Sequence, residues 1–136
     1  MEPYRILEHM ADLKIAGFGK TRQELFVNLA EGMLATTAES RGTTRTNKRR
    51  NFRIGPAPDY ENLLVNFLNE IWFLAQENSE SYTNFDFKKF DKSGIKGSAK
   101  IIPQAKIKLE IKSATFYNLK ITKKDSLYSA IVVFDI

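Results

Sequence analysis

The residues best suited to chemistry are carboxylates in apolar surroundings. Asp135 lies in the closing run Ala-Ile-Val-Val-Phe-Asp-Ile, which is apolar on both alternating faces, as in a strand inside a sheet. A carboxylate there needs a cation, hydrogen-bond donors or water. The neighbouring Ile136 carries the chain-terminal carboxylate, and two hard oxygen groups this close suit Ca²⁺ or Mg²⁺. The alternative is a frayed, solvated end of the chain.

Three further residues are candidates for the same chemistry. Asp12 begins an alternating run and adds a third carboxylate, although it also fits a turn between two strands. His9 is the only histidine, and it fits a hydrogen-bonded structural role better than a place among carboxylate ligands. Lys112 faces the wet side of its expected strand, where a lysine is normally solvated. By themselves, these residues indicate an oxygen-ligand metal site.

Several classes of catalytic site are excluded by composition. The 136 residues include no cysteine, which rules out disulfides, thiolate zinc sites and cysteine nucleophiles. The sequence also lacks a P-loop, a GxGxxG run, a GxSxG run and a second histidine for a metal pair. An ordinary hydrolase is therefore not expected.

Two amphipathic helices are expected to position these residues. Thr21 and Glu24 form a capping box before the first helix, and Asp59 caps the second. Apolar residues then recur at helical spacing. They are Leu25, Phe26, Leu29, Ala30, Met33 and Leu34 in the first helix, and Leu63, Leu64, Phe67, Leu68, Ile71, Trp72 and Ala75 in the second.

The remaining segments alternate with a period of two, which predicts strands. We expect them at residues 4–7, 12–18, 49–54, 82–87, 95–102, 107–121 and 127–136, with a turn at 123–126 joining the last two in a hairpin. This order predicts one domain, residues 1–136, of the α+β class. Its expected architecture is a two-layer sandwich of two main helices on a mixed, largely antiparallel sheet.

The net charge of +5 is unevenly distributed. Residues 41–58 carry six basic and no acidic side chains, and residues 92–136 carry nine basic and three acidic ones. These segments would attract RNA or an acidic protein surface, or they form a solvated lysine-rich surface. Apolar runs fall well short of the roughly 20 residues that span a bilayer, and the N-terminus lacks the apolar core of a signal peptide. We therefore expect a soluble cytoplasmic protein with no membrane contact.

Five segments, in order from end to end, resemble the archease family. The first has the pattern Tyr-x-x-Leu-Asp/Glu-His-Thr-Ala-Asp, with Met10 in place of the usual Thr. The last is the family's closing strand, which ends in Asp-Ile. The segments are Tyr4 to Asp12, Gly19 to Thr21 with Glu24 to Phe26, Leu63 to Glu70, Glu110 to Phe116, and Val133 to Ile136.

This resemblance implies a function that the residues alone do not indicate. Archeases are accessory proteins of the GTP-dependent RNA ligase that seals tRNA halves, and they promote guanylylation of a ligase histidine and repeated turnover. Carried over by position, Asp12, Asp135 and the terminal carboxylate of Ile136 would hold a divalent metal, with calcium expected over magnesium. Lys112 would be an essential basic group beside it. The implied partner is the ligase, with tRNA or RNA-modifying enzymes as further partners.

Two other functions remain open at this point. The first is a basic RNA-binding module, or a chaperone for tRNA or RNA-modifying enzymes, that acts through the basic segments. The second is a metal-dependent hydrolase that uses the carboxylates, although few candidate acids and bases are visible for it.

Overall fold

The structure is a computed structural model that describes residues 2–7, 12–39, 46–103 and 105–136. Its two helices are α1 (Arg22–Thr37) and α2 (Tyr60–Asn78). Its strands are β1 (Tyr4–Leu7), β2 (Leu13–Gly19), β3 (Ala38–Glu39), β4 (Arg49–Ile54), β5 (Ser81–Asp91), β6 (Gly94–Ile102), β7 (Lys106–Ile107), β8 (Ser113–Thr115), β9 (Thr122–Lys124) and β10 (Leu127–Asp135). The expected α+β class with two main helices is confirmed.

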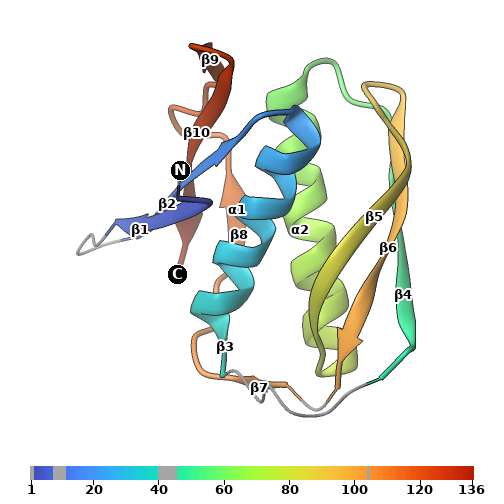
Figure 1. Ribbon diagram of the computed structural model, residues 1–136. Coiled ribbons are helices and arrows are strands. Elements are labelled where there is room, and N and C mark those ends of the chain that lie inside the picture. The colour runs from blue at the N-terminus through green and yellow to red at the C-terminus, as the bar shows by residue number, and fades with distance from the viewer. Residues whose placement is uncertain (1, 8–11, 40–45, 104) are drawn as a thin grey trace.

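The strands form two larger sheets and one short pair. One sheet has the order β1-β2-β10-β8, with β9 also on β10, the other has the order β4-β6-β5, and β3 pairs with β7. All of these described pairings are antiparallel. Both helices lie between the two larger sheets (Figure 1). The arrangement therefore has one layer more than the expected two, because the strands divide between both sides of the helices.

The helix starts are those that the sequence predicts. The Thr21 side chain accepts from the backbone N–H of Glu24 at 3.0 Å, and the Glu24 carboxylate accepts from the N–H of Lys20 at 3.2 Å. At α2, Asp59 accepts from the N–H of Asn62 at 2.7 Å. These bonds satisfy backbone donors that have no partner within the helix, and they hold the pKa of Asp59 below its ordinary value.

The core lies on both sides of the helix layer. Phe26 of α1, Phe67 of α2 and Phe134 of β10 are fully buried. Phe67 contacts Phe26 and also Phe52 of β4, with ring centroids 5.7 Å apart in each pair. A helix that is apolar over most of its surface must be covered on more than one face, and this explains the second sheet.

The expected long strand at residues 107–121 is wrong. Residues 106–107 pair with β3 instead, and only residues 113–115 and 122–124 pair with β10. Outside these pairs, the chain bonds to α2. Trp72 donates from Nε1 to the carbonyl of Ile111 at 2.9 Å, and the Glu61 carboxylate accepts from the N–H of Ile121 at 3.0 Å. Because helix side chains take the backbone groups that a strand partner would take, the alternating pattern does not form one strand.

The other predicted strands are present with small shifts at their ends, and the turn before the last strand is confirmed. Asp125 and Ser126 both have positive φ, at 52° and 63°, in the hairpin that joins β9 to β10. β10 lies between β2 and β8, so the expectation that the closing strand is interior to a sheet is confirmed. Within the part of the chain that the structure describes, no helix is long and apolar enough to cross a membrane.

Candidate functional site

Two aspartates from distant parts of the sequence lie on neighbouring strands. The antiparallel register pairs Leu13 of β2 with Phe134 of β10. Asp12 directly precedes the first of these residues, and Asp135 directly follows the second. The next step of the same register therefore sets the two aspartates beside each other at one end of the sheet.

The third predicted residue joins this end of the sheet from the other side of β10. Asp135 pairs with Ser113 of β8, and the backbone N–H of Lys112 donates to the carbonyl of Asp135 at 2.7 Å. The side chain of Lys112 is exposed. The central strand β10 therefore has Asp12 beside it on one side and Lys112 on the other, and Ile136 directly follows its last residue.

The Asp135 carboxylate belongs to the outer face of the sheet, away from the helices. Leu13 and Phe134 are buried against the helices, and successive side chains of a strand point to opposite faces. Asp135 is accordingly exposed. Asp12 is half-buried, and its Oδ1 atom has almost no solvent-accessible surface. One shielded and one open carboxylate leave the site accessible from solvent.

This donor set suits a hard divalent cation that is only partly enclosed. The side chains of Asp12 and Asp135 supply carboxylate oxygens, and the terminal carboxylate of Ile136, whose residue is exposed, stands next in the chain. Among the described residues, no group of three or more His, Cys, Asp or Glu side chains is placed to hold a metal ion. Calcium takes six to eight oxygens, so this site would keep positions for water or for ligands from a partner.

A shallow groove of about 440 Å³ lies on the same outer face. Its lining includes apolar side chains and two positive charges. The apolar residues are Leu7, Ala16, Phe18 and Ile131, and the charged ones are Arg5 and Lys120. The register pairs Ile131 with Ala16 across β10 and β2. The groove and Asp135 therefore share one face of β10.

Large apolar side chains are also exposed around this end of the sheet. Ile131 is 48% exposed, Phe116 50% and Tyr117 65%, and Ile136 is exposed as well. Ile131 lies in β10, Ile136 directly follows it, and Phe116 and Tyr117 follow β8. Exposed apolar groups beside a polar site are typical of a protein-binding surface.

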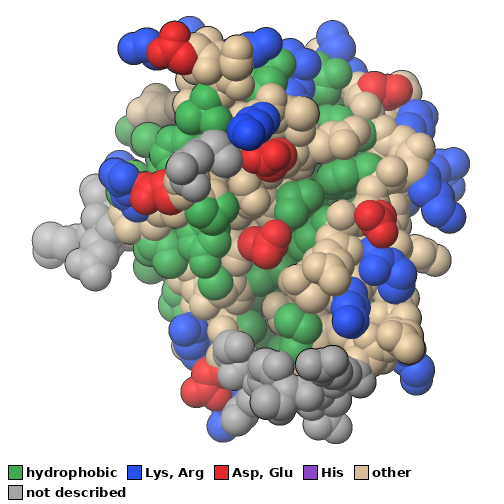
Figure 2. Space-filling model, viewed as in Figure 1, with side chains coloured by type: hydrophobic (Ala, Val, Ile, Leu, Met, Phe, Trp, Pro, Cys, Tyr) green, Lys and Arg blue, Asp and Glu red, His purple; other side chains and the backbone are tan. Residues whose placement is uncertain are grey.

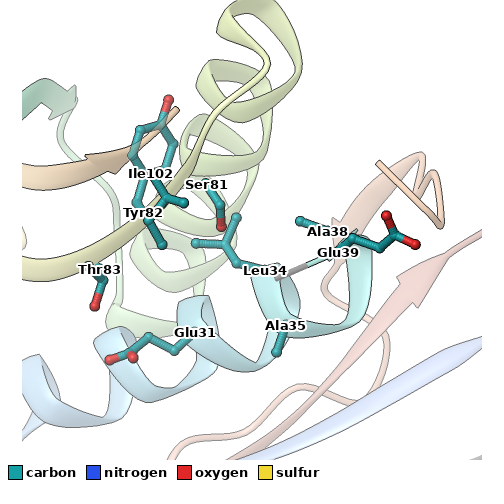
Figure 3. Close-up of a pocket in the computed structure, with 9 residues that line it drawn as sticks. All are labelled: Glu31, Leu34, Ala35, Ala38, Glu39, Ser81, Tyr82, Thr83 and Ile102. Carbon is teal, nitrogen blue, oxygen red and sulfur yellow. The ribbon is translucent and has the colours of Figure 1, made fainter. Parts of the chain in front are cut away.

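The hollow shown in Figure 3 has a different character. It encloses about 200 Å³ between the end of α1, the start of β5 and the end of β6. The carboxylates of Glu31 and Glu39 lie on opposite sides of it and point away from each other. Burial raises the pKa of Glu31 and of the Tyr82 hydroxyl, which donates to Glu80 at 2.9 Å. Nothing here brings two carboxylates together for a metal.

The basic segment at residues 41–58 is only partly available to a ligand. Arg50 donates two hydrogen bonds to Glu80, at 3.0 and 2.8 Å. Arg49 donates to Ser98 and lies 3.3 Å from an oxygen of Asp86. Arg53 instead lies in a row of three cations on neighbouring strands. It pairs with Lys96 of β6, and Lys96 pairs with Lys89 of β5 on its other side. The residues 40–45 and His9 lie outside the described residues.

The sequence indicates Asp12, Asp135 and Lys112 as candidate site residues, but it does not indicate the groove. Ile131 was assigned to a strand that is apolar on both faces, and that pattern alone does not tell which face is open to solvent. The sequence of β1 could have indicated the groove, because Arg5 and Leu7 share one face of that strand and place a basic and an apolar side chain side by side.

Comparison with known proteins shows which family this chain resembles. The chain matches the Archease protein family (MTH1598/TM1083) over residues 4–136. It is 31% identical to "Protein archease" of Methanosarcina barkeri over 144 residues, which cover 98% of this chain and 95% of the relative. It is 25% identical to "Protein archease" of Sulfurisphaera tokodaii, with both chains fully covered.

Two solved structures share the fold. The solution structure of Methanobacterium thermoautotrophicum protein 1598 aligns with a TM-score of 0.71 at 20% identity, over 100% of both chains. A crystal structure from Thermotoga maritima, described as an archease and possible chaperone, aligns with a TM-score of 0.67 at 20% identity, over 96% of this chain and 94% of the other.

Proposed function

We propose, because this chain belongs to the archease family, that it is a cytoplasmic accessory protein in tRNA processing. Its partner would be a GTP-dependent tRNA-splicing RNA ligase, whose guanylylation and repeated turnover it promotes. In this proposal it performs no covalent chemistry of its own and acts by contact with the ligase. The description of the Thermotoga maritima relative as a possible chaperone is consistent with an accessory role.

The observation that carries the proposal is that Asp12, Asp135 and Lys112 lie together at one end of three neighbouring strands. The register aligns the two aspartates, and the Lys112 N–H donates to Asp135. These are the positions that the resemblance identifies as functional. A fold that needed them only for stability would not require two carboxylates to share one open sheet end, since nearby like charges repel each other.

The proposed metal at this site is calcium in preference to magnesium. Asp12, Asp135 and the terminal carboxylate of Ile136 would hold it, and a bound divalent cation would supply positive charge for oxygen ligands of the partner or its nucleotide. A site built from so few protein oxygens suits calcium, because magnesium demands a near-ideal octahedral arrangement.

The chain's own residues would perform three tasks. The sheet holds the two carboxylates at a set spacing, because both are attached to paired strands. Lys112 presents its ammonium to a phosphate or to a carboxylate of the ligase. The groove beside Ile131 and the exposed Phe116 and Tyr117 would provide apolar contact area for docking.

The experiment is multiple-turnover ligation of tRNA halves by the cognate ligase, with and without this protein, together with labelling of the ligase by GTP. We expect stimulation by the unaltered protein and loss of most of it in Asp135→Ala. Asp125→Asn is the control, because Asp125 is exposed in the hairpin turn at the other end of β10 and asparagine tolerates its φ of 52°. Full stimulation by Asp135→Ala, or none by the unaltered protein, would contradict the proposal.

A second candidate function is RNA binding through the outer face of the other sheet. The cation row of Arg53, Lys96 and Lys89 crosses three neighbouring strands, and like charges in opposite positions destabilise a sheet unless an anion lies between them. A small hollow of about 110 Å³ touches all three residues. Salt-dependent tRNA binding that is lost in Arg53→Gln with Lys96→Gln, but kept in Asp135→Ala, would favour this function.

A further inference from the structure

A second groove, unrelated to the aspartates, lies at the end of the molecule where both helices begin. It has a volume of about 410 Å³ and is lined by Lys20, Thr21, Arg22, Gln23, Tyr60, Phe90, Lys123 and Tyr128. In Figure 1 this is the upper end, next to β9. Figure 2 shows several Lys and Arg side chains along this upper edge.

The topology brings four separate segments together here. Tyr128 of β10 pairs with Lys123 of β9 on one side and with Gly19 of β2 on the other. The first of these pairings places a lysine over the tyrosine ring, with Nζ 5.3 Å from its centroid. Tyr60 comes from the first turn of α2 and stacks on Phe90 of β5 with centroids 6.4 Å apart.

Arg22 occupies the space between the two tyrosines. Its guanidinium carbon lies 4.1 Å from the centroid of Tyr60 and 5.2 Å from that of Tyr128. A guanidinium that rests on aromatic rings keeps its five in-plane N–H donors for oxygen ligands. The two rings also fix its position, so less conformational entropy is lost when a ligand binds.

The charged residues that line this groove are all basic. Lys20, Arg22 and Lys123 line it, and no lining residue is acidic. Within the described residues, none of the three forms an ion pair with a carboxylate. Three cations held around one concave surface create a positive potential that attracts an anion.

We infer that this groove binds the phosphate of a nucleotide, either free or at an exposed end of RNA. The cations would pair with the phosphate, and the rings of Tyr60, Phe90 and Tyr128 would provide the aromatic wall that lies beside a sugar or base. The volume is in the range of small-ligand pockets, and the compact lining suits one nucleotide better than a long strand. A nucleotide combines the anionic and planar groups that these walls match.

The nucleotide groove is separate from the aspartate site. Tyr128 and Asp135 are seven residues apart on one extended strand, a separation of about 23 Å at about 3.3 Å per residue. One nucleotide cannot reach from one to the other. The inference therefore does not depend on the proposed metal or on the proposed ligase.

The test uses the full chain and two probes, GTP and a short single-stranded RNA with a 5′-phosphate. Binding is measured by calorimetry for GTP and by fluorescence anisotropy for the RNA, at about 50 and about 200 mM salt. The first variant combines Lys20→Glu with Lys123→Glu. The matched control combines Lys106→Glu with Lys108→Glu, which are also exposed lysines and change the net charge by the same amount.

We expect the groove variant to weaken binding by at least about tenfold, because two ion pairs at about 4 Å are replaced by repulsion, and the control to change it by less than about threefold. Binding of GTP assigns the groove to free nucleotides, and binding of RNA alone assigns it to RNA ends. Equal losses in both variants would show attraction to net charge only and would overturn the inference. Failure of both probes to bind the unaltered protein would also overturn it, and unfolding curves of both variants verify that the fold is kept.

Discussion

Removal of the Asp135 charge tests the proposed metal site without disturbing the fold. In Asp135→Asn the side chain keeps its size and stays exposed, while the bond from the Lys112 N–H goes to the backbone carbonyl and is unaffected. Surface changes of this kind alter stability by less than about 0.5 kcal/mol. If calcium stabilises the two proteins to an extent that differs by more than this, the difference therefore reports the metal site itself.

The size of the effect follows from electrostatics. At about 4 Å, a carboxylate and a divalent cation attract each other by about 2 kcal/mol even at the dielectric constant of water, twice the energy for two unit charges. This corresponds to about a thirtyfold loss of calcium affinity. At a calcium concentration of about 100 times the dissociation constant, binding stabilises the unaltered protein by about 2.7 kcal/mol. The same concentration stabilises the variant by about 0.9 kcal/mol.

The assay is thermal unfolding with and without calcium, supported by calorimetric titration. For a chain of this length the two stabilisation energies correspond to rises in Tm of about 9 °C and about 3 °C. Asp125→Asn is the matched control, because Asp125 is exposed and has φ of 52°, a conformation that asparagine tolerates. It should keep the full shift. An unaltered protein that calcium does not stabilise, or an Asp135→Asn protein with undiminished affinity, would refute the reasoning.

Three other outcomes are expected. Lys112→Ala should abolish most stimulation of the ligase while calcium affinity, measured by titration, stays within about threefold, since a lysine binds no cation. Gly19→Ala should lower the free energy of unfolding by about 3 kcal/mol in urea titrations, because an added Cβ would lie 2.4 Å from the backbone nitrogen of Leu25. Gly55→Ala should not lower the free energy of unfolding in this way, because nothing lies within 4 Å of the added Cβ. Because burial raises the pKa of Glu31 above 4.5, the native state holds that proton more tightly than the unfolded chain, so stability falls as the pH rises through the raised pKa. Glu31→Gln should remove this decline and be the more stable protein at neutral pH.

Local patterns were sufficient where local physics decides the structure. Both helix starts were predicted from Thr21, Glu24 and Asp59, because a cap is a bond between residues three apart. The β9 to β10 turn was predicted for the same reason. Asp125 and Ser126 both adopt positive φ there, and aspartate favours this conformation in turns.

Long-range partners decided what the patterns could not. Residues 107–121 alternate like a strand, yet Trp72 and Glu61 of α2 take the backbone groups of Ile111 and Ile121. The number of layers was missed for a similar reason. A broad apolar surface on a helix shows that it must be covered, and not whether one sheet or two will cover it.

The sequence by itself determined which carboxylates could hold a cation, Asp12 and Asp135 among them, and the resemblance indicated Lys112 as a basic group beside them. Only the tertiary structure decided that these residues meet, because the meeting depends on the register between β2, β10 and β8. A shift of one residue in that register would turn the side chains of a strand to the opposite face. The groove of Lys20, Arg22 and Lys123 arises in the same way, since pairing between segments about a hundred residues apart in sequence assembles it and no local pattern records that pairing.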